Sequence, residues 1–459
     1  MDVHLELSGT GRLRARLEGQ LRDGVRSGRL RAGTRLPPSR ALARDLGVSR
    51  GVVVEAYAQL VAEGYLTARR GAGTTVAAQR VDAPPAARTT APPRPVAYDL
   101  RTGRPDLSAF PRVAWHAAVG RALHGLPDDA LGYGDWRGHE PLRLALADHL
   151  GRTRGVLADP DRIVVCGGLY QGLHVLWRAL SRHGARRVAI EDPGWRGQRR
   201  SVQYAGLEFV AVPVDERGLI VDALQTSDAD AVVVSPAHQY PTGVVLAPER
   251  RAQLVAWAHE RRALVVEDDY DAEYRYDREP VGALQGLAPE RVVYAGTASK
   301  TLAPALRLGW LVVPDWLAPD VAEEKDLADR GTPVLEQAAL ADLLARGELE
   351  RHLRRTRRRY RARRDALTTA LARHLPQATI SGAAAGLHLV AQLPADSHET
   401  TIAAAAHARS VAVDTLHSTC TVIAPRPPTL LLGYAALPQA ALQRAAAQLG
   451  RAATHDTTA

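Results

Sequence analysis

Lys300 carries a chemistry that almost no other residue of this chain can perform. Of the 59 lysine and arginine residues, only Lys300 and Lys325 are lysines. A lysine amine can form a Schiff base with an aldehyde, whereas a guanidinium group stays protonated and non-nucleophilic. Lys325 lies in the run Glu-Glu-Lys-Asp, which predicts a charged surface, but Lys300 lies between a β-rich run and an apolar segment. The sequence therefore predicts carbonyl chemistry at Lys300.

Two groups of residues can bind a phosphate. Thr297 and Arg307 bracket Lys300, and arginine binds phosphate bidentately. Gly167, Gly168 and Leu169 precede a predicted helix, and glycines there let backbone N–H groups face an anion. The glycine pattern is a weak signal by itself. It gains weight beside Thr297 and Arg307.

An aromatic residue and an acidic cluster follow two other β-rich runs. Trp195 can stack on a flat ring or belong to the core, and residues 267–271 read Glu-Asp-Asp-Tyr-Asp. A carboxylate there can keep a pyridine nitrogen protonated and a tyrosine can donate to a phenolic oxygen; a solvated loop is the alternative. An aldehyde on a phosphorylated pyridine needs all of these groups, so the sequence predicts pyridoxal 5'-phosphate as cofactor. No spacing of cysteines suggests a metal site.

Short β-rich runs alternate with helical segments from residue 98 onward. This alternation predicts an α/β domain with a mostly parallel sheet, and ligands of such sheets bind at the carboxyl ends of strands. The residues singled out above follow these runs. The predicted strands are 162–166, 187–191, 207–214, 231–235, 263–268, 291–295 and 308–313.

The N-terminal segment predicts a winged helix-turn-helix. Apolar residues recur at helical spacing in 13–25, a second helix follows Pro37-Pro38 with Ser39 as a cap, and a third begins after Ser49. Residues 64–76 then predict a hairpin with a glycine-rich tip. In this arrangement the third helix enters the major groove of DNA.

The charge of the N-terminal segment supports DNA binding. Residues 1–80 contain fourteen arginines and seven acidic residues, and a basic segment of this kind attracts nucleic acid. Solvated arginines in an arginine-rich protein are the alternative. The predicted DNA-contacting residues lie at two helix starts and at the hairpin tip: Arg40, Ser49, Arg50, Arg69, Arg70 and Gly73.

Composition divides the chain into four segments. The predicted domains are a winged helix-turn-helix (1–76), a proline- and alanine-rich linker (77–97), a large α/β domain (98–450) and a polar tail (451–459). No apolar run is fit to span a bilayer and no signal peptide is recognisable. Cys166 and Cys420 predict inert core thiols. We expect a cytoplasmic, nucleoid-associated protein without a membrane partner.

Longer runs resemble known families. Residues 29–76 resemble the GntR-type winged-helix domain, and residues 98–450 resemble the fold-type I aminotransferases, with a small C-terminal α+β subdomain. Together they resemble the MocR subfamily of GntR transcriptional regulators. The runs that carry the likeness are Arg-Pro-Asp-Leu-Ser-Ala-Phe-Pro (104–111), Tyr-Gly-Asp-Trp-Arg-Gly (133–138), Ser-Pro-Ala-His-Gln-Tyr-Pro-Thr-Gly (235–243), Glu-Asp-Asp-Tyr-Asp (267–271), the Lys300 segment (296–309) and Leu-Leu-Leu-Gly-Tyr-Ala (430–435).

The resemblance implies a role for each site residue. Lys300 would form the Schiff base, Asp268 would pair with the pyridine nitrogen and Tyr270 with the ring hydroxyl. Trp195 would stack on the ring, and Tyr133 would reach the phosphate of a neighbouring subunit, which implies a domain-swapped homodimer. The phosphate-binding set would be Thr297, Arg307 and the backbone at Gly168 and Leu169.

Some positions depart from the family pattern. Trp136 stands where proline is usual, and Ala298 and Tyr170 replace other residues beside the site. Leu431 aligns with the arginine that holds the substrate carboxylate in aminotransferases, although Arg426 is close in sequence. These changes bear on the effector and weaken the case for efficient transamination.

Three functions are compatible with these patterns. The favoured one is a DNA-binding regulator that uses pyridoxal phosphate to sense an amine, an amino acid or the vitamer itself at a double-stranded operator. The alternatives are an aminotransferase with an accessory DNA-binding domain, and a DNA-binding dimer whose large domain has lost its cofactor. The nine arginines of 351–364 predict a solvated helix face or, as the alternative, a second DNA-backbone surface.

Overall fold

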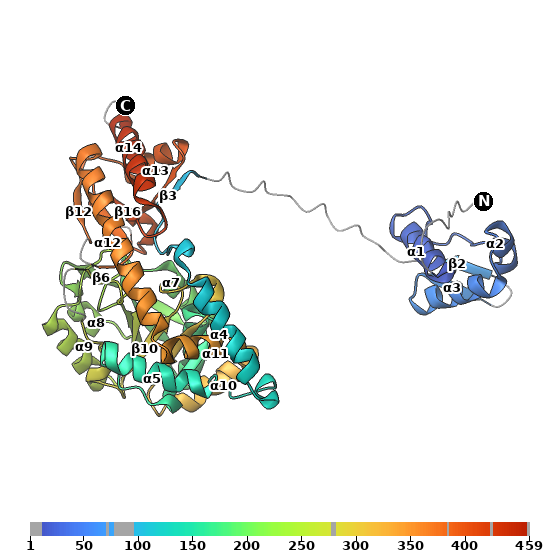
Figure 1. Ribbon diagram of the computed structural model, residues 1–459, viewed down its shortest axis with the longest axis horizontal. Coiled ribbons are helices and arrows are strands. Elements are labelled where there is room, and N and C mark those ends of the chain that lie inside the picture. The colour runs from blue at the N-terminus through green and yellow to red at the C-terminus, as the bar shows by residue number, and fades with distance from the viewer. Residues whose placement is uncertain are drawn as a thin grey trace. The chain divides into compact units, whose positions relative to one another are not determined.

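The computed structural model describes residues 12–69, 73–77, 96–276, 281–382, 385–422 and 426–456 (Figure 1). The chain divides into two compact units, residues 1–93 and 94–459. Most of the predicted linker, residues 78–95, lies outside the described residues.

The N-terminal unit is a winged helix-turn-helix, as predicted. Its antiparallel hairpin pairs Leu66 with Val76 and Arg69 with Gly73, and one apolar core joins the three helices to the hairpin. Ser39 is the first residue of its helix and does not cap it, because Pro38 holds the N-cap position. The elements are α1 (Leu13–Arg26), α2 (Ser39–Asp45), α3 (Arg50–Ala62), β1 (Leu66–Arg69) and β2 (Gly73–Val76).

The large unit is built on an eight-stranded sheet of order β4-β11-β10-β9-β8-β5-β6-β7. Strands β10, β9, β8, β5 and β6 are parallel to one another, whereas β11 and β7 run opposite to their neighbours. The bounds are β4 (Ile163–Cys166), β5 (Arg187–Asp192), β6 (Glu208–Asp215), β7 (Gly218–Leu219), β8 (Ala231–Val234), β9 (Leu264–Asp269), β10 (Val292–Thr297) and β11 (Gly309–Val312).

Helices cover both faces of this sheet. Successive residues of a strand point to opposite faces, so Val233 packs with one helix layer and Val232 with the other. This two-sided burial explains why the strands are continuous apolar runs in the sequence. The first layer contains α6 (Leu169–Arg182), α7 (Arg196–Tyr204) and α10 (Ala318–Asp329), and the second contains α8 (Val221–Gln225) and α9 (Pro248–Glu260).

A smaller α+β subdomain follows the long helix α12 (Glu348–His374), which Figure 1 shows running from the large body to the small sheet. Its four strands have the order β12-β13-β16-β15 and are antiparallel. The bounds are β12 (Thr379–Ser381), β13 (His388–Gln392), α13 (Glu399–Ala408), β14 (Val411–Ala412), β15 (Asp414–Thr415), β16 (Thr429–Gly433) and α14 (Gln439–Asp456). Strand β3 (Tyr98–Asp99) pairs with β14, and α4 (Arg112–Gly125), α5 (Glu140–Arg154) and α11 (Val334–Ala345) complete the large unit.

Three predictions about individual segments are wrong. Lys325 is fully buried and its Nζ lies 2.5 Å from Asp329 Oδ1, because it shares the inner face of α10 with Val321 and Glu324. Cys420 is only half-buried, although Cys166 is a core residue. The polar tail does not begin at 451, since α14 continues to Asp456 and buries Ala452 and Ala453. No helix in the described part of the chain is long and apolar enough to cross a membrane.

Candidate functional site

A cavity of about 340 Å³ opens at the carboxyl ends of β9 and β10. Seven of the predicted cofactor residues line it: Leu169, Trp195, Asp268, Tyr270, Thr297, Lys300 and Arg307. They come from segments that are far apart in the chain, so the sheet brings them together as the strand order predicts. Gly168 adjoins the cavity, whereas Tyr133 does not line it.

Lys300 reaches the inner wall of this cavity. Its Nζ donates a hydrogen bond of 2.7 Å to the carbonyl oxygen of Gly103. Burial lowers the pKa of the Lys300 ammonium, and the carboxylates of Asp271 and Asp268 oppose this effect. A lowered pKa increases the fraction of neutral amine, the form that attacks an aldehyde.

Asp268, near the end of β9, has one oxygen engaged and one unengaged. Oδ2 accepts a hydrogen bond of 2.9 Å from Gln198 Nε2, whereas Oδ1 is buried without a hydrogen-bond partner among the described residues. Burial raises the pKa of Asp268 to about 7. A protonated ring nitrogen placed against Oδ1 would satisfy this oxygen and stabilise its charge, which fits a pyridine-containing cofactor.

Tyr270 is held by a residue that the sequence analysis did not select. His238 Nδ1 lies 3.0 Å from the Tyr270 hydroxyl and 2.9 Å from Asp271 Oδ2. Burial raises the pKa of Tyr270 well above its usual value, so the phenol stays protonated and can donate to a ring oxygen. In the sequence, the only indication of a role for His238 is that it lies within the run 235–243, one of the runs that carry the family resemblance.

The residues predicted to bind the phosphate form a compact cradle. Gly168 is the N-cap of α6 at φ +92°, with no side chain capping the first N–H groups of that helix. Arg307, at φ +53°, donates to the Gly167 carbonyl oxygen, and a Cβ on Gly168 would lie 2.9 Å from its Nη2. Thr297 Oγ1 accepts from Ser299 N–H at 3.1 Å. Helix N–H groups beside a guanidinium suit a phosphate.

Trp195 forms an outer wall of the cavity. It is 37% exposed, and its ring meets that of Tyr170 edge-on, with centroids 6.3 Å apart. A Cβ on Gly197 would lie 2.3 Å from the indole, so the glycine permits this ring position. An exposed aromatic face at a cavity is available for stacking. The lining residues that the sequence analysis did not predict include Thr102, Tyr240 and His388.

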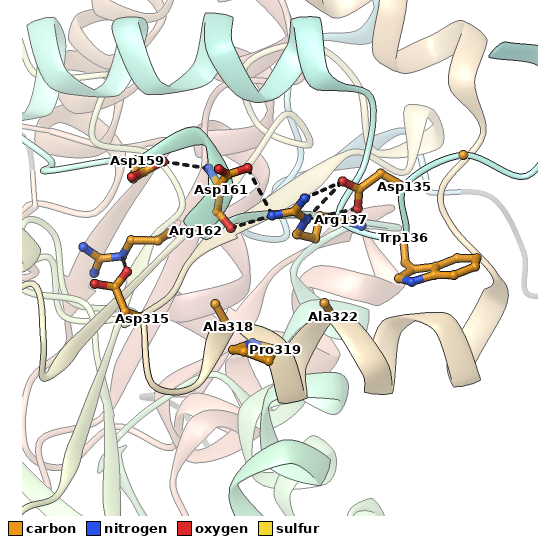
Figure 2. A pocket seen from close by; sticks show the side chains of 11 residues that line it. Asp135, Trp136, Arg137, Asp159, Asp161, Arg162, Asp315, Ala318, Pro319 and Ala322 are labelled. Carbon is orange, nitrogen blue, oxygen red and sulfur yellow. Dashed lines mark hydrogen bonds and ion pairs between the residues drawn. The ribbon is translucent and has the colours of Figure 1, made fainter.

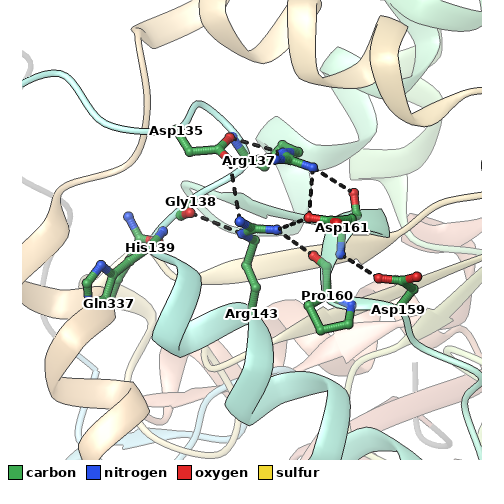
Figure 3. A network of polar contacts seen from close by, with 9 residues as sticks. All are labelled: Asp135, Arg137, Gly138, His139, Arg143, Asp159, Pro160, Asp161 and Gln337. Carbon is green, nitrogen blue, oxygen red and sulfur yellow. Dashed lines mark hydrogen bonds and ion pairs between the residues drawn. The ribbon is translucent and has the colours of Figure 1, made fainter.

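Tyr133 does not line the cavity and is 83% exposed. The segment after it is fixed by charge pairs: Arg137 and Arg143 both contact Asp135 and Asp161, at 2.7 to 3.3 Å (Figure 3). This segment borders a surface pocket of about 640 Å³ beside α10 (Figure 2). The charge pairs therefore hold the segment that follows Tyr133 in place, and Tyr133 itself lies on the surface.

Arg330 fixes the aromatic side chains of the same segment. Its guanidinium carbon lies 5.4 Å from the ring centroids of both Tyr133 and Trp136, within the range of a cation–π contact. Trp136, which replaces the usual proline, thus stabilises the Arg330 position.

The predicted DNA-contacting residues are all exposed where the structure describes them. Arg40 lies in the first turn of α2, Ser49 is the N-cap of α3 and Arg50 its first residue, while Arg69 and Gly73 flank the hairpin tip. Arg70 lies outside the described residues. Arg40, Arg50 and Arg69 form no ion pair with any described residue, in contrast to Arg14 and Arg22, which pair with Glu55 and Glu63 of the α3 region.

Comparison with known proteins identifies both units. Residues 13–76 match the model for bacterial regulatory proteins of the gntR family, and residues 98–449 match aminotransferase class I and II. The pyridoxine biosynthesis transcriptional regulator PdxR of Corynebacterium glutamicum is 38% identical over 396 residues, covering 84% of this chain and 85% of that protein. The chain belongs to the MocR-type gntR regulators. The probable rhizopine catabolism regulatory protein MocR of Rhizobium meliloti is 37% identical, with 81% of this chain and 80% of that protein covered.

Solved structures give the same fold for the large unit of this MocR-type chain. The multiple substrate aminotransferase of Thermococcus profundus superimposes with a TM-score of 0.72 at 26% identity, covering 80% of this chain and 93% of the other. The predicted family, fold class and DNA-binding domain are confirmed. The fold and these relatives imply pyridoxal phosphate as cofactor, and the unengaged Asp268 oxygen and the Gly168–Arg307 cradle fit it.

Proposed function

We propose that the protein is a transcriptional regulator that binds an operator in double-stranded DNA and senses a small amine, an amino acid or the pyridoxal phosphate vitamer itself. One observation carries this proposal. A gntR-family domain with exposed arginines at its helix starts is joined in one chain to an aminotransferase-like body, in which one cavity is lined by the residues predicted to bind the cofactor. We also propose that it acts in the cytoplasm, associated with the nucleoid.

Each residue of the cavity has a proposed role. Pyridoxal phosphate, when bound, supplies an aldehyde that accepts amines. Lys300 binds this aldehyde, Asp268 holds the proton of the ring nitrogen and Tyr270 donates to the ring oxygen. Trp195 stacks on the ring, excluding water from one face. Phosphate is held by Thr297, Arg307 and the N–H groups at Gly168 and Leu169.

A route from the cavity toward the DNA-binding domain begins at Lys300. Its Nζ contacts Gly103, in the segment that immediately follows the linker, and the neighbouring Thr102 hydroxyl contacts Tyr240 at 2.9 Å and Asp414 at 2.8 Å. Lys300 would hold the cofactor through Nζ, and an amine that took its place would change the partners of Nζ. Such a change can bias the position of the segment that carries the linker.

The second candidate, an aminotransferase, is favoured by the retained side chains and by a 29% identical aromatic-amino-acid aminotransferase of Thermococcus litoralis. The cavity argues against it. Leu431 is fully buried and apolar, and Arg426 pairs with Asp192 Oδ2 at 3.2 Å, outside this cavity. Arg307, in the phosphate cradle, is the one arginine among the described residues that line the cavity. A substrate carboxylate therefore has no evident guanidinium partner among the described lining residues.

Two observations support a homodimer, which we propose to be domain-swapped. Tyr133 is exposed although the resemblance assigns it to a cofactor site. Helix α4 buries only Ala118 and leaves Val113 86% and Leu123 57% exposed. Large exposed apolar side chains on one helix indicate a protein interface.

Electrophoretic mobility shift with the full chain tests the regulator. A duplex selected from a random pool should bind in low salt, and its affinity should change with added pyridoxal phosphate in the wild type but not in Lys300→Ala. The visible absorbance band of the bound cofactor should also be lost in Lys300→Ala. Absence of DNA binding in both states would reject the proposal.

A transamination assay tests the second candidate. Incubation with a panel of amino donors and an oxo-acid acceptor should give turnover far below the typical enzyme value of about 10 per second. Turnover near that value would instead make the protein an aminotransferase with an accessory DNA-binding domain.

A further inference from the structure

A second cavity, of about 490 Å³, lies on the large unit between the end of α5, the segment after β9 and the first turns of α12. It shares no lining residue with the Lys300 cavity. Five of its eleven lining residues are arginines: Arg152, Arg154, Arg275, Arg354 and Arg357.

Positive charge exceeds negative charge among the described residues that line this cavity. Arg354 and Arg357 form no ion pair with any described residue, and Arg357 donates only to the Glu273 carbonyl oxygen, at 2.9 Å. Among the described residues, the two acids that line the cavity are Glu273 and Glu350. Burial raises the pKa of Glu273 to about 7, so this carboxyl is only partly ionised at neutral pH. An anion entering the cavity would therefore be attracted.

Arg154, which lines the same cavity, has one unengaged donor. Its side chain is 3% exposed, its Nε donates to Asp269 Oδ2 at 2.7 Å and its Nη1 to the Val281 carbonyl oxygen at 2.6 Å. Its Nη2 is buried and has no hydrogen-bond partner among the described residues. A buried guanidinium N–H without a partner is costly, and an anionic oxygen in the cavity would satisfy it.

We propose that this cavity is a second ligand site, which binds a small molecule through a carboxylate or phosphate group. Arg154 holds the anionic group from the base of the cavity, and Arg354 and Arg357 close over it from α12. Phosphate and carboxylate oxygens both match the planar fork of arginine. The two acids that line the cavity, Glu273 and Glu350, limit the charge that the site can accept, which favours a small anion over a polyanion.

The second site is placed to regulate the first, because Asp269 links Arg154 to the cofactor-binding segment. Asp269, which holds Arg154, lies between Asp268 and Tyr270 on the strand end that meets the cofactor. It also accepts a hydrogen bond of 2.7 Å from the Tyr294 hydroxyl. A ligand bound to Arg154 is therefore connected to the cofactor-binding segment through a single side chain, that of Asp269.

Calorimetric titration of the cofactor-loaded full chain tests the proposal, because loading fills the phosphate cradle of the first cavity. Inorganic phosphate and succinate serve as separate probes, so that the response distinguishes a phosphate from a carboxylate ligand. At least one should bind saturably in the millimolar range or below. Arg354→Gln should weaken that binding about tenfold, as expected for the loss of one charged hydrogen bond.

The matched control is Arg358→Gln, one turn further along α12. Arg358 is exposed and forms no ion pair with any described residue, like Arg354, but does not line the cavity. Its replacement removes the same charge and should leave probe affinity unchanged. Equal weakening in both variants would indicate general electrostatic attraction and overturn the proposal, as would the absence of saturable binding of either probe.

Discussion

Asp268 shows how a single side chain can link cofactor binding to stability. Its pKa in the folded chain is about 7, above the value of 3.8 for a free side chain, because of burial. The folded state therefore holds a proton that the unfolded state releases as pH rises through this window, and this lowers the free energy of unfolding. A ring nitrogen bound at Oδ1 would remove this penalty, so cofactor binding should stabilise the chain most at neutral and higher pH.

Asp268→Asn tests this linkage in the cofactor-free protein. The variant cannot ionise, so it should be more stable than the wild type, by a margin about 2 to 3 kcal/mol larger at about pH 8 than at about pH 5. Urea unfolding at both pH values measures the difference. The same variant should bind pyridoxal phosphate more weakly. A margin that does not change with pH would show that Asp268 is not protonated in the folded chain.

Lys300 and its bracketing residues were predictable because their types are chemically distinctive and close in sequence. Gln198 and His238 were not, since glutamine and histidine are common and reach the site only through packing against β9. Lys325 was misjudged for a related reason. Its charged neighbours suggest solvent, but helical spacing turns Lys325 toward the core with Val321.

At the scale of elements, the start of α6 is where we propose that the cofactor phosphate is held. Gly168 is at φ +92°, and a Cβ there would press on Arg307 at 2.9 Å. Gly168→Ala should therefore weaken cofactor affinity about tenfold or more, in addition to the cost of about 1 kcal/mol for a Cβ at positive φ. Fluorescence titration with pyridoxal phosphate measures the affinity.

A control glycine separates strain from contact. Gly206 has φ +80°, and a Cβ added there would meet nothing within 4 Å beyond its own chain neighbours. Gly206→Ala should lose a similar stability while keeping cofactor affinity. Loss of affinity in both variants would show that strain, rather than the Arg307 contact, explains the effect.

The strands were predictable as elements because each is buried on both faces, which leaves an apolar run in the sequence. Their order was not, because β4 joins β11 rather than its sequence neighbour β5. Helix α12 illustrates the same limit. Its arginines suggested one solvated face, but Arg363 and Arg364 are buried and Arg359 pairs with Asp106, so only part of the run faces solvent.

At the scale of the whole molecule, DNA affinity should depend on the exposed arginines of the N-terminal unit. Arg40→Ala removes a cation at the start of α2, where a phosphate is expected. The slope of log affinity against log salt should become shallower by about 0.9, the loss of one phosphate contact. Arg14→Ala removes an arginine that pairs with Glu18 and Glu55 and should leave the slope unchanged. Fluorescence anisotropy at several salt concentrations measures both, and equal slopes for Arg40→Ala and the wild type would contradict the assignment.

Subunit mixing decides whether Tyr133 completes a neighbouring site. Tyr133→Ala and Lys300→Ala should each bind cofactor poorly as homodimers, for different reasons. In a mixed dimer, the Lys300 of one chain meets the Tyr133 of the other, so one of the two sites is intact if the tyrosine acts across the interface. If Tyr133 acts within its own chain, neither site is intact.

Unfolding and refolding the two variants together should therefore restore tight cofactor binding at about half of the sites in each mixed dimer, which absorbance titration can count. Recovery requires both a dimer and an exchange of side chains between subunits, so its absence in a mixture shown to contain mixed dimers would show that Tyr133 does not act across the interface.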